Sequence, residues 1–505
     1  MRYLPNGEAM KLADTKTIQE IGMSSMVLME RAALKSVSIM ERKKVDLSNV
    51  LVVCGSGNNG GDGFAIARLL QLKGKKVTTV FVGNQTSCTK ETAQQMQILR
   101  NYGFIIEHTI PQGEFSAIID CIFGIGLSRP IKDQYYRIIE EINQKCSEKI
   151  AIDIPSGISA ATGEVLGIAF QAHMTITFAF EKIGMVMYPG AQYTGTIMIA
   201  DIGIPFHIFE ENLDIFYTYD KEDIPKRMPQ RTPDTHKGSY GKVLMVVGSK
   251  GMAGAAYLSS KAAYTVGAGL IIIYTHEDNR LILQQQLPEA IIRTYTVYDE
   301  AKLEELLEWA DVTVIGPGIG ENNLALQLLE GTLRMGTTPC VLDADGLNLL
   351  SKNKQLWEYI KFGNYVLTPH MKEMCRLLNC SMKELQNQRF ESVLELAETY
   401  NITCVLKDAR TCVASKNHHL YVNTSGNNAM AKGGSGDVLS GIIAGLFAQK
   451  LSSHYAATVG VYLHGLSGDY ARTQKGNYGV LASDIVESIS GVIIQSGEVD
   501  HYEKV

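Results

Sequence analysis

"LVVCGSGNNGGDGFAIARLL", residues 51–70, has the pattern of a buried strand, a tight glycine turn and an apolar helix. Gly55, Gly57 and Gly60 match the spacing G-x-G-x-x-G, which lets the backbone approach a pyrophosphate at the start of a helix. A dinucleotide site also needs an acidic residue near the end of the next strand, and "VTTVFVGNQTS" at 77–87 contains none. The stretch therefore predicts a Rossmann-like unit with a phosphate site but without the usual cofactor anchor.

Strand-like and helix-like runs alternate on both sides of this stretch. An amphipathic helix is expected over residues 10–40, and further strands at 77–82, 117–121, 149–154 and 195–200. Such alternation predicts a parallel sheet covered by helices on both faces. Charges, prolines and turn formers fill residues 206–240, after which a second alternation begins at "KVLMVVG". We expect an α/β protein with two domains, residues 1–217 and 218–505.

Composition narrows the class of protein. The 505 residues carry a net charge of -6 without a block of like charge, which argues against nucleic-acid and membrane partners. The nine cysteines include no C-x-x-C pair and suggest reduced thiols. The polar start is unlike a signal peptide, and no apolar run approaches the roughly 20 residues of a membrane span. We expect a cytoplasmic protein and a homo-oligomer, although no pattern fixes the number of subunits.

Acidic residues gather at the predicted strand ends of the first domain. Asp120 and Asp153 each end a strand, and Asp62 follows the glycine turn. The carboxyl ends of parallel strands open on one crevice, so these acids could share it with Asn58, Asn59, Ser156 and the loop Gly124–Pro130. Capping a helix explains any single Asp about equally well. Together, the oxygen ligands suit a hard cation better than zinc.

Several strand ends also converge in the second domain. They carry "GPGIG" (316–320), "DADGLNLL" (343–350), "TPHMKE" (368–373) and "KDART" (407–411), and their residue types suit a nucleotide and a polar substrate. His370 could instead tie down a turn, and Lys407 could be a surface charge.

Asp437 lies in "GGSGDVLSG" at the start of an apolar helix, where N–H groups and the helix dipole favour an anion. A carboxylate there would seem to compete with a phosphate. It can instead take the proton from a hydroxyl that attacks phosphorus, while the helix end stabilises the phosphoryl oxygens. The alternative, a simple helix-start residue, does not explain why the apolar helix would start at a cleft.

The motifs "NNGGDG", "DIPSG", "HKGSYGKVLMVVG", "TPHMKE" and "AKGGSGDVLSGIIAG", in this order, resemble the bifunctional NAD(P)H-hydrate repair enzymes over nearly the whole chain. The resemblance implies an N-terminal epimerase of hydrated NAD(P)H, called NAD(P)HX. It also implies a C-terminal ribokinase-like domain that dehydrates (S)-NAD(P)HX with ADP, magnesium bridging the nucleotide phosphates.

The same resemblance implies roles for individual residues. The hydrate in the first domain would contact Asn58, Asn59, Gly60, Gly61, Asp62, Gly124, Ile125, Gly126, Leu127, Ser128, Arg129, Pro130 and Asp153. A potassium ion would bind Asn59, Asp120 and Ser156. In the second domain, the hydrate would face Ala253, Gly318, His370 and Asp437, and the nucleotide would contact Lys407, Asp408, Ala409, Arg410, Thr411 and Gly436. Asp437 is the expected base of dehydration and Asp153 the expected acid/base of epimerisation, with Asp62 and Asp120 as rivals.

Asp408 departs from the family pattern, which usually has glycine after the lysine. Aspartate tolerates a left-handed backbone better than most residues, but it adds a negative charge near phosphates. Two other hypotheses remain open at this point. One is a ribokinase-type small-molecule kinase with an accessory N-terminal domain, in which the phosphate stays on the product. The other treats the N-terminal half as a binding module without catalysis.

Overall fold

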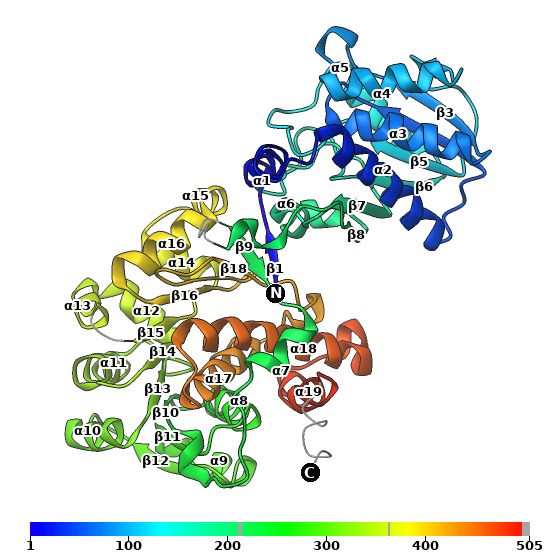
Figure 1. The fold of residues 1–505 in the computed structure, drawn as a ribbon. Helices are drawn as coiled ribbons and strands as arrows, with labels where there is room; N and C mark the ends of the chain where they lie inside the picture. Colours follow the sequence, from blue (N-terminus) through cyan, green and yellow to red (C-terminus); the bar gives the residue numbers. More distant parts are fainter. Residues whose placement is uncertain (211–214, 362–363, 497–505) are drawn as a thin grey trace. The chain divides into compact units, whose positions relative to one another are not determined.

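The computed structural model describes residues 1–210, 215–361 and 364–496 (Figure 1). The chain divides into two compact units, Arg2–Phe216 and Tyr217 onward, the latter joined by Met1. Each unit is an α/β domain built on a largely parallel sheet. No helix in the described part of the chain is long and apolar enough to cross a membrane.

The first unit is built on a parallel sheet with the order β4-β3-β2-β5-β6-β7-β8. Its strands are β2 Asn49–Cys54, β3 Lys76–Phe81, β4 Ile106–Glu107, β5 Ala117–Cys121, β6 Glu148–Ile152, β7 Met174–Phe178 and β8 Thr196–Ala200; a short β1, Arg2–Leu4, precedes them. Its helices are α1 Gly7–Gln19, α2 Ser25–Arg42, α3 Asn58–Leu72, α4 Lys90–Asn101, α5 Asp133–Gln144 and α6 Ile183–Val186.

The two faces of this sheet are buried by different helices. Figure 1 shows α2, α3 and α4 side by side, as their packing contacts also require. On the other face, Ile139 and Ile142 of α5 pack with Leu51 and Val53 of β2. Because both faces are covered, the central strands β2 and β5 are mostly apolar and almost entirely buried, as expected of buried parallel strands.

The prediction of one opening helix over residues 10–40 is wrong in one respect, because the structure has two helices there, α1 and α2. The chain leaves the helical conformation after Gln19, and Gly22 has a φ of 85°. Glycine adopts this left-handed backbone without strain. The break lets α1 and α2 take different directions, which gives α1 a separate role described below.

The second unit has the strand order β9-β18-β17-β16-β15-β14-β13-β10-β11-β12. Its strands are β9 Phe216–Thr218, β10 Lys242–Val246, β11 Leu270–His276, β12 Ile291–Tyr295, β13 Val312–Ile315, β14 Cys340–Leu342, β15 Tyr365–Leu367, β16 Thr403–Leu406, β17 Cys412–Ala414 and β18 Tyr421–Val422. Those from β12 to β16 in this order are parallel, whereas β17 pairs antiparallel with β16 and β18. The sequence did not predict β17 and β18, which are too short for a clear pattern.

Helices cover both faces of the second sheet. They are α7 Ile224–Arg227, α8 Ala253–Thr265, α9 Arg280–Gln286, α10 Glu300–Trp309, α11 Asn323–Met335, α12 Asp345–Lys352, α13 Trp357–Ile360, α14 Met371–Leu378, α15 Met382–Asn387, α16 Arg389–Tyr400, α17 Ser435–Ala448, α18 Ser453–Gly479 and α19 Ala482–Gln495. The apolar α17 packs on α8, α18 and the central strands (Figure 1). It is buried from Val438 to Ala448, so only its first turn faces the carboxyl edge of the sheet.

Candidate active sites

The first candidate site centres on Asp153, directly after β6. Its Oδ1 atom accepts a 2.6 Å hydrogen bond from the Nζ atom of Lys182, an ion pair in which the lysine side chain is only 1% exposed. The same Nζ atom donates to the Oγ1 atom of Thr177 at 2.6 Å. Asp153 has a φ of 69°, an uncommon conformation for a residue with a Cβ atom, of the kind that often marks functional sites. Pairing with a buried lysine therefore fixes this carboxylate in one orientation.

The glycine turn lies beside Asp153. A Cβ atom on Gly124 would come 3.2 Å from Oδ2 of Asp153 and 3.3 Å from Cβ of Asn59. A Cβ atom on Gly60 would come 1.9 Å from the carbonyl oxygen of Gly55, so the turn closes only with glycine there. The structure thus brings together the start of α3, the loop at 124–130 and Asp153, as predicted for parallel strand ends.

The other residues predicted to contact the hydrate lie in these same two segments. Gly61 and Asp62 are buried in the first turns of α3, and Asn58 is exposed at its start. In the loop, Gly126, Ser128, Arg129 and Pro130 are exposed, whereas Ile125 and Leu127 are half-buried.

Three oxygen-bearing side chains meet around the backbone of Phe123. Ser156 accepts a hydrogen bond from the N–H of Phe123, and Asn59 donates through Nδ2 to its carbonyl. Asp120 accepts from the N–H of Ser156 at 2.8 Å and from its hydroxyl at 2.7 Å. The Oδ1 atom of Asn59 is buried and has no hydrogen-bond partner among the described residues. An orphaned oxygen beside a carboxylate and a hydroxyl fits a hard cation.

Two further carboxyl groups surround the Asp153–Lys182 pair. Burial raises the pKa of Asp62 well above its ordinary value, and the nearby charges of Asp153 and Asp14 add to this effect. Burial likewise raises the pKa of Asp14 to about 6, with Asp153 acting in the same direction and Lys182 opposing. Burial also raises the pKa of Asp120 to about 6, although hydrogen bonds from Ser156 and Ile122 oppose it.

Sequence reasoning missed Lys182 and Asp14. Lys182 follows the carboxyl end of β7, so the rule that placed Asp120 and Asp153 at this edge could have included it. Asp14 lies on α1, far from any strand end, and no sequence signal distinguishes it.

The second candidate site lies at the start of α17. Gly434 precedes the helix with a φ of 90°, and a Cβ atom there would come 2.6 Å from Cδ1 of Leu258. Asp437 is in the first turn, half-buried among the N–H groups of the helix end. Burial raises its pKa to about 7, Asp343 and Asp345 act in the same direction, and Lys407 opposes. A carboxyl with this pKa can accept a proton near neutral pH.

Lys407 faces this helix start. Its Nζ atom donates to Oδ1 of Asp343 at 2.6 Å, and it lies 3.4 Å from where a Cβ atom of Gly436 would be. Asp343 also accepts a hydrogen bond from Ser440, one turn along α17. Burial would raise the pKa of Asp343, but the Lys407 ion pair and the hydrogen bonds outweigh it and lower the pKa. Lys407 is therefore held as a paired, partly buried cation at the helix end and is not a free surface charge.

Gly318 lies against the start of α8, which begins at Ala253. A Cβ atom on Gly318 would come 3.0 Å from Cβ of Ala255, in the first turn of α8. Asp345 accepts a hydrogen bond from the N–H of Gly320 at 2.8 Å, which fixes the "GPGIG" loop to the start of α12.

His370 caps α14. Its Nδ1 atom accepts hydrogen bonds from the N–H groups of Lys372 and Glu373, and Nε2 lies 3.2 Å from the Glu373 carboxylate. These contacts match the turn-stabilising hypothesis, yet the imidazole is 46% exposed and remains accessible to a substrate. Burial raises the pKa of Glu373 to about 7.

Asp408 does not have a left-handed backbone, so the glycine of the family pattern is not required here for conformation. Its carboxylate forms a 2.8 Å ion pair with Arg389, the first residue of α16. Ala409 is exposed and Arg410 half-buried in the turn that follows, and the hydroxyl of Thr411 donates to the carbonyl of Asp408 at 3.1 Å. Arg389 thus compensates the negative charge of Asp408 in the loop at 407–411.

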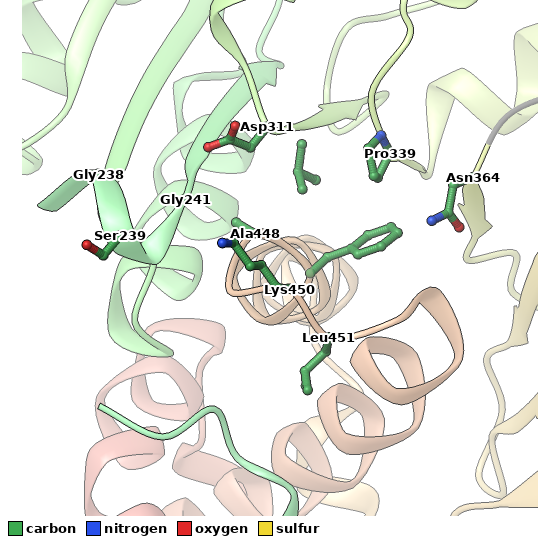
Figure 2. Close-up of a pocket in the computed structure, with 11 residues that line it drawn as sticks. Gly238, Ser239, Gly241, Asp311, Pro339, Asn364, Ala448, Lys450 and Leu451 are labelled. Atoms are coloured by element: carbon green, nitrogen blue, oxygen red, sulfur yellow. The ribbon is translucent and has the colours of Figure 1, made fainter. Parts of the chain in front are cut away.

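A separate hollow lies at the opposite edge of the second sheet (Figure 2). Its volume is about 470 Å³. The residues that line it lie at the starts of β10, β13, β14 and β15 and at the end of α17. Asp311 on its wall is already bonded to the N–H of Lys242. None of the predicted site residues lines this hollow. The candidate chemistry is therefore confined to the carboxyl edge.

Comparison with known proteins agrees with this description. Residues 25–184 match the family "YjeF-related protein N-terminus", and residues 243–490 match the family "NAD(P)H-hydrate dehydratase". A ribokinase-like superfamily protein from Enterococcus faecalis has a similar fold, with a TM-score of 0.51 and 30% identity over 56% of this chain and 96% of that one. The fold and sites define an α/β enzyme that joins a Rossmann-like domain to a ribokinase-like domain.

Relatives of known activity span both domains. The bifunctional NAD(P)H-hydrate repair enzyme of Coxiella burnetii is 36% identical over 92% of this chain and 94% of its own length. That of Escherichia coli is 34% identical over 94% of this chain and 90% of its own length. The chain belongs to the family of bifunctional NAD(P)H-hydrate repair enzymes.

Proposed function

We propose that this enzyme interconverts the (R) and (S) epimers of NAD(P)HX in its first domain and dehydrates (S)-NAD(P)HX in its second, converting ADP to AMP and phosphate. The observation that carries the proposal is Asp437, a carboxyl with a pKa raised to about 7 at a helix start beside the ammonium of Lys407, which is itself paired with Asp343. A base and a cation at one helix end suit phosphoryl transfer to a hydroxyl.

Dehydration needs a better leaving group than hydroxide. Asp437 takes the proton of the C6 hydroxyl, whose oxygen attacks the β-phosphorus of ADP and releases AMP. A magnesium ion on the nucleotide phosphates would supply positive charge that offsets theirs. The N–H groups of the helix start and Lys407 stabilise the phosphoryl oxygens as charge spreads over them. The phosphate then leaves with the C6–O electron pair, assisted by the N1 lone pair, and loss of a C5 proton restores the dihydropyridine.

The nucleotide binds to residues 407–411 and Gly436. The hydrate binds to Ala253, Gly318, His370 and Asp437. The convergence of these segments at one sheet edge supports the assignment. The Arg389–Asp408 ion pair supports it as well, because it removes an uncompensated negative charge from the nucleotide loop.

In the first domain, Asp153 is the acid/base group, and the hydrate is held between residues 58–62 and 124–130. Asn59, Asp120 and Ser156 would hold a potassium ion, supported by the orphaned Oδ1 atom of Asn59. The ion would supply a fixed positive charge at the glycine turn. Because a chiral dehydratase pocket accepts one C6 epimer, an epimerase on the same chain lets all of the damaged cofactor be recovered.

The chain forms a homo-oligomer in the cytoplasm. Leu281 and Ile282 of α9 and Val297, which follows the edge strand β12, are 72%, 50% and 70% exposed, and such apolar groups favour burial against another subunit. All nine cysteines are free, as in a reducing compartment. Light scattering of the purified protein measures its mass directly, and a monomeric mass would refute the oligomer.

Supplying hydrated NADH and ADP tests the activity. Repair regenerates the near-ultraviolet absorbance of NADH and releases inorganic phosphate. A small-molecule kinase would leave the phosphate on its product and would do neither. Separating the two epimers by chromatography, before and after incubation without nucleotide, tests the epimerase independently.

A further inference from the structure

The helix α1 lies against the epimerase site, although it precedes the segment that matches the N-terminal family, residues 25–184. A Cβ atom on Gly7 would come 2.7 Å from the carbonyl oxygen of Ile125, so the start of α1 abuts the loop at 124–130. Asp14 is seven residues further on, which is about two helical turns and places it on the same face as Gly7. Asp14 therefore faces the site from α1.

Asp14 belongs electrostatically to the cluster around Asp153. Its carboxyl interacts with Asp153 and Lys182, and Asp62 of α3 interacts with all three. The cluster thus holds three carboxyls and one ammonium, and the ammonium is committed to Oδ1 of Asp153. One cation cannot balance three carboxylates in a buried place, so at least one of Asp14 and Asp62 favours the protonated form.

Resting on the proposed epimerase activity, we propose that Asp14 is a second catalytic residue of this site and acts as the acid partner of Asp153. Lys182 is a positioning residue that holds the Asp153 carboxylate. The site then presents one ionised and one protonated carboxyl to the same substrate.

The chemistry of the hydrate requires such a pair. C6 carries both the hydroxyl and the ring nitrogen N1, so its configuration can invert by ring opening. Asp153 takes the hydroxyl proton, the oxygen forms the C=O bond of an aldehyde, and the C6–N1 electron pair moves to N1, which receives a proton from Asp14. After rotation about C5–C6, N1 attacks the other face of the carbonyl carbon, and both protons return.

Asp14 fits the acid role better than its neighbours. Asp62 and Asp120 are 8% and 0% exposed, and Asp120 is bonded to Ser156 and Ile122. Asp14 is only half-buried, so a substrate can reach it. Burial raises its pKa to about 6, which allows it to give and take a proton near neutral pH.

The test compares Asp14→Asn with Glu8→Gln, a matched change on the exposed surface of α1, in the full chain. We expect Asp14→Asn to lower kcat for epimerisation about 100-fold in both directions, the range of a lost general acid, and Glu8→Gln to leave it unchanged. Wild-type kcat/KM should fall at high pH as Asp14 ionises, and this limb should vanish in Asp14→Asn. Asp14→Glu keeps a carboxyl and should keep the limb at a reduced rate.

The outcomes separate the two levels of the proposal. If the wild type epimerises NAD(P)HX and the Asp14→Asn variant keeps its kcat and both pH limbs, the role of Asp14 alone is overturned. No epimerisation by the wild type overturns the proposed function of the domain. Should Asp14→Asn fail to fold, as judged by thermal unfolding, Asp14→Glu decides: loss of its high-pH limb contradicts the proposal.

Discussion

The Nζ atom of Lys407 lies 2.6 Å from Oδ1 of Asp343, and this ion pair joins the ends of β14 and β16 under the first turn of α17. The side chain of Asp343 is 1% exposed and that of Lys407 is 18% exposed. Water therefore solvates these two charges less than it solvates the charges of surface groups. The pair holds a cation where the transferred phosphoryl group is proposed to lie, while Ser440 ties the same carboxylate to α17.

Asp343→Asn should therefore lower both stability and dehydration. Removing one partner of a buried ion pair leaves the other uncompensated, which costs about 3 kcal/mol. Urea unfolding measures the loss. The matched control is Glu300→Gln, which breaks the exposed Arg334–Glu300 pair and should cost under about 1 kcal/mol. Equal effects of the two changes would contradict the structural role given to Asp343.

The two activities should be separable by single substitutions. Asp437→Asn removes the base of dehydration and should lower that kcat by a factor on the order of 100 to 10,000 while epimerisation continues. Asp153→Asn should do the reverse. Both rates can be followed in each purified variant. Equal loss of both activities from either change would argue against two independent sites.

The pH dependence of dehydration should follow Asp437. Its pKa is raised to about 7, and a base must be ionised to accept a proton, so kcat/KM should fall as pH decreases through about 7. The same raised pKa means that the folded state binds this proton more tightly than the unfolded state does, so its contribution to stability is lost as pH rises through 7. Asp437→Asn should remove that loss, which thermal unfolding at pH 6 and pH 8 can measure.

The proposed nucleotide-binding loop, residues 407–411, can be tested with a double-mutant cycle of Arg389 and Asp408. Arg389→Ala leaves the charge of Asp408 uncompensated, so KM for ADP should rise several-fold. Asp408→Gly should be nearly silent, and the double variant should regain most of the affinity because the repulsive charge is gone. A double variant as weak as Arg389→Ala would show that Arg389 acts on something other than Asp408.

Much of the fold follows from sequence because parallel sheets buried on both faces need apolar strands, and glycine turns mark where helices begin. The strand-end rule also predicted that Asp120, Asp153 and Lys407 lie at the carboxyl edges of their sheets, which is where β5, β6 and β16 end. It could not indicate which carboxyl pairs with which cation, because Lys182 and Asp153 are separated by β7 and meet only in three dimensions.

Two other features could not be predicted from the sequence, for physical reasons. Asp14 reaches its site because α1 and α2 separate at Gly22, a break that a continuous amphipathic pattern conceals. The charge of Asp408 in the loop at 407–411 could be read from sequence, but its compensation by Arg389 depends on how α16 begins.

A structure with ADP and a non-reactive analogue of (S)-NADHX bound tests the central claim most directly. We predict that a carboxylate oxygen of Asp437 lies within hydrogen-bonding distance, roughly 3 Å, of the C6 hydroxyl, with the β-phosphate over the first turn of α17. A complex in which the Asp437 side chain turns into the protein interior, away from both ligands, would contradict the mechanism.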